Sequence, residues 1–170
     1  MVPHDSDKLF PKMPNDHSMS SSAMQVASKI AELGVRKNFL NGRFVAHSTL
    51  RPLSYLDSEF IEIGTSSQTQ ICVRCDDLSV WSLAHDRAPW PVNNSYDLFD
   101  QAMEMVELMH LDDIEVAGMD DFARLGDNVR DAIRAIDSDS VGSNTFWNEF
   151  VWDIRSGDYG NIFDDDDPGG

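Results

Sequence analysis

Basic residues are scarce in this sequence compared with acidic ones. It carries 13 lysines and arginines against 30 aspartates and glutamates, which gives a formal net charge of −17 over 170 residues. This excess repels nucleic acid and anionic membranes, and nucleic-acid binding in turn depends on basic patches. We therefore expect no direct nucleic-acid binding and no membrane binding, and we expect basic proteins to be attracted to the chain.

Long apolar runs and cysteines are also scarce. No apolar run approaches the roughly 18 residues that a membrane span needs, and the N-terminus lacks the apolar core of a signal peptide. Two cysteines do not make a disulfide scaffold. These absences predict a cytoplasmic location, which would be the host cytoplasm if the gene belongs to a phage. Since 41% of the residues are apolar, the chain is still expected to fold.

Catalytic motifs are missing as well. The sequence has no nucleophile-elbow glycines, no phosphate-binding glycine loop and no metalloprotease helix. His47, Ser48 and Asp57 are residue types used in nucleophilic catalysis, but nothing in their spacing marks a site. Pairs of acids occur throughout the chain, so they do not indicate general acid–base catalysis. We expect a protein that acts by binding, with no cofactor.

Composition divides the chain into three parts. Residues 1–22 are rich in proline and serine, which predicts a flexible N-terminal arm. Residues 23–160 have the apolar periodicity of one α+β domain, and residues 161–170 form an acidic C-terminal tail.

Apolar spacing predicts strands first and helices afterwards within that domain. Asn41-Gly42 lies between two apolar triplets and predicts a hairpin turn, whereas Pro89 and Pro91 predict a rigid loop. The expected fold is a small antiparallel sheet of about four strands, residues 39–84, packed against three to four helices. Strands are predicted at 59–64, 69–75 and 78–84, with turns at 64–67 and 76–77, and helices at 23–36, from 95, from 120 and at 144–155.

The two cysteines form a single CxxC motif, Cys72-Val-Arg-Cys75. One CxxC supplies half of a zinc site, and His85 is a weak candidate for a further ligand. A redox motif is expected to open a helix, but here the motif ends a predicted strand. Two residues three apart on a strand also point to opposite faces. Reduced structural thiols are the expected state, and a zinc-binding protein remains a second alternative.

The predicted helix that begins near Ser95 has an acidic outer face. Its acids point away from its apolar positions, and no lysine or arginine occurs between Arg87 and Arg124. The next helix is different, because it spaces acids and arginines three or four residues apart, at Asp120–Arg124, Asp127–Arg130 and Asp131–Arg134. The acids of the gap form the candidate partner-binding surface: Asp97, Asp100, Glu104, Glu107, Asp112, Asp113, Glu115, Asp120 and Asp121.

Two interpretations of this acidic surface remain open. It is either the solvated face of an acidic protein or an imitation of a phosphate backbone, with one carboxylate per about 5 Å compared with one phosphate per about 3.4 Å of a DNA strand. The second interpretation predicts an inhibitor of a basic protein, such as a nuclease or a restriction or CRISPR effector, or a toxin-immunity protein. The alternative function is a phage or assembly component whose N-terminal arm is ordered on a neighbouring subunit.

Overall fold

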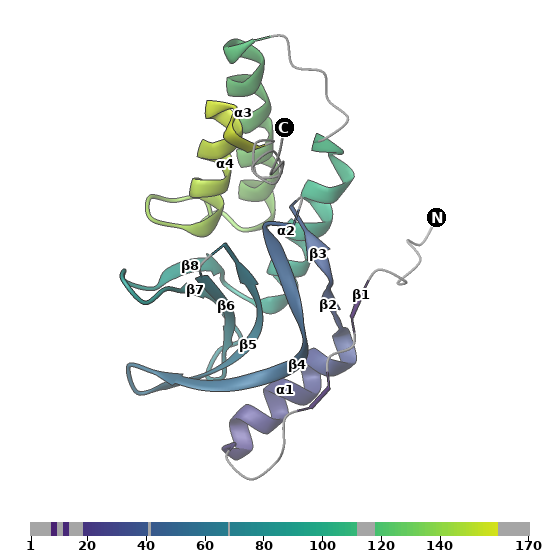
Figure 1. Ribbon diagram of the computed structural model, residues 1–170, viewed down its shortest axis with the longest axis vertical. Helices are drawn as coiled ribbons and strands as arrows, with labels where there is room; N and C mark the ends of the chain where they lie inside the picture. The colour runs from purple at the N-terminus through teal and green to yellow at the C-terminus, as the bar shows by residue number, and fades with distance from the viewer. Residues whose placement is uncertain are drawn as a thin grey trace, which may run out of the picture.

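A curled antiparallel sheet organises the chain in a computed structural model that describes residues 8–9, 12–13, 19–40, 42–67, 69–111 and 118–159 (Figure 1). The strands are β1 (Lys8–Leu9), β2 (Val35–Arg36), β3 (Asn38–Phe39), β4 (Phe44–Tyr55), β5 (Ser58–Ser66), β6 (Thr69–Arg74), β7 (Val80–Leu83) and β8 (Trp90–Asn93). The helices are α1 (Ser21–Leu33), α2 (Tyr96–Leu108), α3 (Met119–Ile136) and α4 (Phe146–Ser156). The predicted α+β class is confirmed.

The main sheet is larger than predicted. Six strands follow one another in the order β3-β4-β5-β6-β7-β8, each antiparallel to its neighbour, and β1 and β2 form a separate two-stranded ribbon. The expected rigid loop around the prolines is wrong, because Trp90 to Asn93 pair with β7. Pro91 is accommodated there because β8 is an edge strand, where one side of the backbone needs no ladder partner.

The turn predicted at 64–67 begins only at Ser67, because β5 continues to Ser66. Gly64 lies inside β5, at an irregularity in its pairing with β6, and the chain turns at Ser67 instead, where φ is 53°. A Cβ on Gly64 would lie 2.6 Å from the carbonyl oxygen of Val45, so the close approach of β4 requires glycine. The predicted hairpin between β3 and β4 is present, with Gly42 at a φ of 81°.

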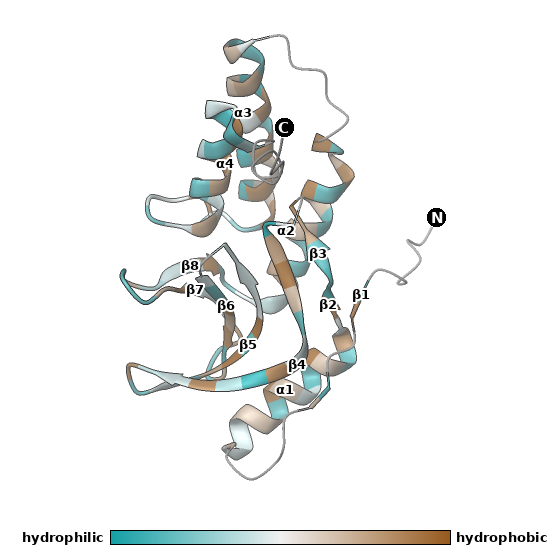
Figure 2. Ribbon diagram, viewed as in Figure 1, coloured by the Kyte–Doolittle hydropathy of each residue, from teal (hydrophilic) through white to brown (hydrophobic). Residues whose placement is uncertain are grey.

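Each helix begins at a residue that accepts a hydrogen bond from the first turn, except α3. Ser20 caps α1, Ser95 caps α2 and Thr145 caps α4, each through its side-chain oxygen. The predicted helices are thus present, with starts shifted by one or two residues. In Figure 2, α3 and α4 alternate between hydrophobic and hydrophilic residues along their length, as amphipathic helices do.

All the described helices lie outside the curl of the sheet or at its end (Figure 1). The main hydrophobic core joins α1, α2, α3 and α4 to one face of the sheet, with Trp147 fully buried. No helix in the described ranges is long and apolar enough to cross a membrane.

A buried carboxylate fixes the α3–α4 pair to the sheet. Asp137, which is 4% exposed, accepts hydrogen bonds from Asn93 Nδ2 at 3.0 Å, Asn94 N at 2.8 Å and Asn94 Nδ2 at 2.9 Å. Asn93 in turn accepts a bond from Trp147 Nε1 at 2.9 Å. Because buried polar groups are costly without partners, this network holds the end of α3 against β8.

The described parts of the predicted N-terminal arm contact the domain itself. Leu9 pairs with Val35, and Lys12 N donates to Ser48 O at 2.8 Å, while Leu50 N donates to Lys12 O at 3.1 Å. The rest of the arm up to residue 18 and the predicted tail at 161–170 lie outside the described residues.

Candidate functional site

The acidic face of α2 points outward as predicted. Phe99 and Val106 are buried on the opposite side of the helix. The side chains of Asp100, Glu104 and Glu107 are 26%, 38% and 48% exposed, so exposure rises toward the C-terminal end. Asp97 is exposed in the first turn, where the helix dipole favours an acid.

Two cations from the N-terminal part of the chain lie across this face. Lys8 Nζ is 2.9 Å from Asp100 Oδ2. Arg36 approaches Asp100 at 3.3 Å, Glu104 at 3.7 Å and Glu107 at 2.6 Å. The gap in basic residues between Arg87 and Arg124 therefore does not leave the acidic face of α2 without basic neighbours in the fold. Lys8 and Asp100 are separated by 92 residues, and Arg36 and Glu107 by 71, so only the tertiary fold reveals the pairing.

Asp100 is the centre of this charge cluster. Lys8 and Arg36 are direct cross-strand partners in the β1–β2 ribbon, and like charges in that position repel. Asp100 contacts both of them, so it offsets the repulsion and holds the ribbon on α2. The two cations, Lys8 and Arg36, offset two of the four acids of α2, so half of the negative charge predicted for this helix face remains.

The other five acids of the predicted partner-binding surface lie beyond α2, and only two of them are among the described residues. Asp112, Asp113 and Glu115 lie outside them. Asp120 and Asp121 occupy the first turn of α3, and Asp121 pairs with Arg124 in place of the predicted Asp120. The other two predicted α3 pairs, Asp127–Arg130 and Asp131–Arg134, are present.

The CxxC residues lie on opposite sides of the sheet, as their spacing predicted. Cys72 packs with Phe60 and Leu83, whereas Cys75 belongs to the main core. Burial, reinforced by Glu62, raises the pKa of Cys72, and burial with help from Glu59 and Asp76 raises the pKa of Cys75 to about 11. Both thiols are therefore protonated and unreactive at neutral pH.

A zinc site is not assembled around these residues. His85 is exposed in the loop between β7 and β8, beyond the strand that pairs with β6. Among the described residues, no group of three or more histidine, cysteine and acidic side chains is arranged to hold a metal ion.

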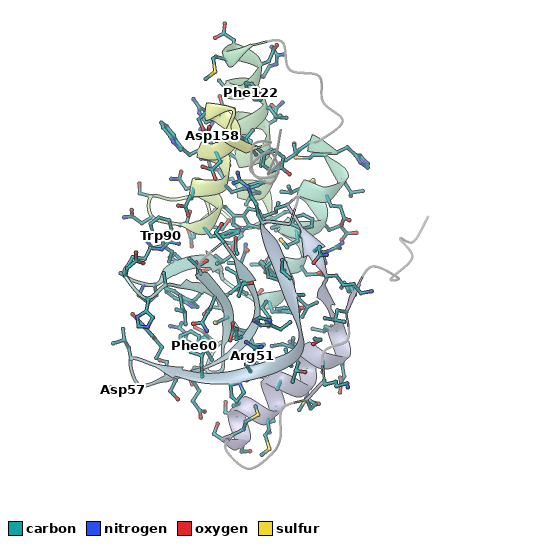
Figure 3. All side chains as sticks on the ribbon, viewed as in Figure 1. Arg51, Asp57, Phe60, Trp90, Phe122 and Asp158 are labelled. Carbon is teal, nitrogen blue, oxygen red and sulfur yellow. The ribbon has the colours of Figure 1, made fainter. Side chains whose placement is uncertain are left out.

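The inner face of the curled sheet is a second candidate surface, which we call the open face. No described helix covers it in Figure 1, and Figure 3 places Phe60 within the curl. Phe60, Cys72 and Leu83 are at most 5% exposed, because the curl packs the strands' side chains against one another. The partly buried members surrounding them are Leu53, Tyr55 and Trp81.

A row of four cross-strand partners crosses the open face, with charged residues on β4 and β5 and hydrophobic residues on β6 and β7. Arg51, Glu62, Cys72 and Trp81 are successive cross-strand partners on β4, β5, β6 and β7. Glu62 is 4% exposed and its Oε1 lies 2.8 Å from His47 Nε2. Arg51 is the only arginine that makes no ion pair with another residue in the described ranges (Figure 3).

Exposed acids lie in the turns at both ends of the open face. Asp57 is at the tip of the β4–β5 hairpin, and Asp76 lies in the β6–β7 turn at the same end. Asp86 lies in the β7–β8 loop at the other end. None of the three has an ion pair within the described residues. The open face therefore has an aromatic and aliphatic centre between acidic ends, which resembles the anatomy of protein interfaces.

The candidate catalytic residue types do not come together. His47 contacts Glu62 near the middle of β4, while Asp57 lies at the hairpin tip beyond the far end of that strand. Trp81 and Leu83 lie on one face of β7 and Val80 on the other, as the alternation of side chains along a strand requires. Periodicity could not show which of those faces the helices cover.

The fold and surfaces define an α+β protein with helices on one side of a curled meander and an uncovered aromatic face on the other. No protein-family model matches the chain, and no curated protein and no solved structure is significantly similar to it.

Proposed function

We propose that this protein acts by binding a basic protein partner, and that the open face is the centre of the interface. The observation that carries the proposal is an uncovered aromatic sheet face between acidic turns. Aromatic residues are favoured at interface centres, and two partly exposed ones lie here, Tyr55 and Trp81, packed on the buried ring of Phe60.

Charge favours a basic partner. Nine of the thirteen lysines and arginines already pair with described acids, and the chain as a whole carries a net charge of −17. A negative surface accelerates association with a positively charged partner and disfavours binding of acidic proteins. The unpaired Asp57, Asp76 and Asp86 would meet the basic rim of the partner.

A nucleic-acid-handling protein is the partner class that we propose, because a groove built for phosphates is strongly basic. Occupation of that groove would inhibit the partner, as expected for an anti-restriction, anti-CRISPR or toxin-immunity protein. The contact would not be centred on α2, since Lys8 and Arg36 already neutralise half of its acidic face.

Two double variants with the same change in net charge test the location. Asp57→Lys/Asp76→Lys alters one end of the open face, and Glu104→Lys/Glu107→Lys alters α2. Each would be immobilised for affinity capture from host lysate at low and high salt, with mass spectrometry of the eluted proteins. We expect the first to lose the wild-type partner and the second to retain it.

If the α2 variant loses the partner and the open-face variant retains it, the interface lies on α2. Equal loss in both variants would mean that net charge alone drives capture, with no defined interface. A third variant, Tyr55→Ser, leaves the charge unchanged. If it captures the partner as well as the wild type does at high salt, the aromatic centre has no part in binding.

A further inference from the structure

A cavity of about 610 Å³ lies where three loops of the sheet meet α4. One wall is a single face of the helix, because Phe146, Glu149, Phe150 and Asp153 follow helical spacing. The β5–β6 turn and the β7–β8 loop form the other walls. The volume falls within the range of about 300–1,000 Å³ that is typical of small-molecule sites.

One ion pair at this cavity is structural. Arg43, 9% exposed, bonds the carboxylate of Asp153 and the carbonyl of Asp158 at 3.2 Å. Its guanidinium also lies 6.0 Å from the ring centroid of Phe150 and 5.3 Å from that of Tyr159. These contacts engage both terminal nitrogens of Arg43, while its Nε is buried without a hydrogen-bond partner among the described residues.

The second ion pair is open. Arg87 and Glu149 approach only to 3.6 Å, beyond hydrogen-bond distance, although both line the cavity. Arg87 instead lies over the ring of Trp90 at 3.7 Å, and its Nε is buried without a hydrogen-bond partner among the described residues. An arginine held flat on an aromatic ring is preorganised to bind a carboxylate through its free edge.

We propose that the cavity binds a small zwitterion of the free amino acid type, with its carboxylate on Arg87 and its ammonium group on Glu149. A simple anion would meet three acids in the lining, Asp86, Glu149 and Asp153, and a simple cation would meet two guanidinium groups. A neutral molecule with adjacent opposite charges satisfies both members of the open pair and is not repelled by the net charge.

The hydroxyl groups of the β5–β6 turn indicate the ligand's side chain. Ser66, Ser67 and Thr69 line the cavity, and the Thr69 hydroxyl, which donates to Ser66 O at 2.8 Å, keeps acceptor capacity for a ligand. Phe146 and Phe150 are 8% and 3% exposed and offer little apolar surface. A neutral polar side chain fits this lining best.

Asp86 belongs both to this lining and to one end of the open face, but the ion pair assigned to the ligand, Arg87 and Glu149, lies outside that face. Amino-acid binding is measured on the protein alone, so the result does not depend on the proposed partner.

Titration with a panel of free amino acids with neutral polar side chains tests this site, by calorimetry and by amide NMR shifts over Phe146–Asp153. We expect at least one of them to bind, and we expect its N-acetyl and its carboxamide derivatives to bind about tenfold more weakly or worse, because each removes one charged hydrogen-bonding group. Equal binding of either derivative would overturn the zwitterion assignment, as would the absence of any response across the panel.

Two carboxylate-to-amide variants locate the site. Glu149→Gln removes an acid that is 48% exposed, so the fold should tolerate it, and we expect the affinity for the bound amino acid to fall about tenfold or more. Asp97→Asn is the matched control on α2 and should bind as the wild type does. Unchanged affinity in Glu149→Gln would overturn the proposal, as would an equal loss in the control.

Discussion

Replacing Asp100 with asparagine removes the carboxylate that Lys8 and Arg36 share. The three side chains are 26%, 16% and 16% exposed, so solvent screens their interaction only in part. A hydrogen bond to a charged group contributes about 1.5–3 kcal/mol, and the lower end suits this partly exposed pair. The uncompensated cross-strand repulsion between Lys8 and Arg36 adds about 0.5 kcal/mol. The expected loss of unfolding free energy is therefore about 2 kcal/mol.

Urea denaturation measures this loss as a fall in the transition midpoint with an unchanged slope. For a chain of this size, the same change lowers the melting temperature by roughly 4–8 °C. Glu104→Gln is the matched control. Its carboxylate is 38% exposed and 3.7 Å from Arg36, so we expect a loss below about 0.5 kcal/mol.

A double-mutant cycle isolates the pairwise contribution. Lys8→Met and Asp100→Asn should show a coupling energy of about 1 kcal/mol, because each removes one end of the 2.9 Å contact. A coupling energy near zero, together with a stability of Asp100→Asn within about 0.5 kcal/mol of the wild type, would refute the reasoning. The acidic face of α2 would then be free for a partner, and the surface predicted from sequence would regain its support.

Four further outcomes are expected. Asp137→Ala should cost about 3 kcal/mol in chemical denaturation, because it leaves buried amide donors unpaired. Gly64→Ala should cost about 1–3 kcal/mol, since the new Cβ would overlap the β4 backbone. A hydrogen bond from Arg74 holds the pKa of Asp77 well below its usual range. The ionised carboxylate therefore stabilises the folded protein above about pH 4, and this stabilisation is lost as the pH falls. Asp77→Asn should flatten the acid side of the curve of unfolding free energy against pH, by less than about 1 kcal/mol because Asp77 is 46% exposed. With a pKa of about 11, Cys75 should not react with a thiol reagent at pH 8 until the protein is unfolded.

Local signals predicted the helices well and the extent of the sheet poorly. Ser95 and the apolar spacing after it specify the start of α2, because capping and periodicity act within a few residues. The strand β8 was missed because Pro91 and Pro89 disfavour a ladder, and only the edge position of Trp90–Asn93 makes the pairing acceptable. The β1–β2 ribbon is two residues long on each side and has no periodicity to detect.

The candidate surfaces differ in how much sequence could reveal. The outward acids of α2 followed from helical geometry, but their partners Lys8 and Arg36 could not be found without the tertiary fold. Because side chains alternate along a strand, Trp81 and Val80 must lie on opposite faces of β7, but this alternation does not show which face the helices cover. The open face is therefore a property of topology, since every described helix packs on the same side of the sheet or at its end.

Charge is balanced by two routes in this molecule. On α3, Asp127 and Asp131 pair with arginines within one helical turn. On α2, the acids pair with Lys8 and Arg36 of the β1–β2 ribbon, which lies far away in the sequence. Arg51 stands outside both arrangements, exposed on the open face, where the cost of leaving it unpaired is small in water. Because Lys8 and Arg36 offset only half of the acidic face of α2, exposed acids without an ion pair remain on the described helices as well as in the turns of the sheet. Those on helices are Glu32, Asp97 and Asp120, and those in the turns are Asp57, Asp76 and Asp86. Only the acids in the turns flank an aromatic centre, so a basic partner bound there would combine charge complementarity with the exclusion of water.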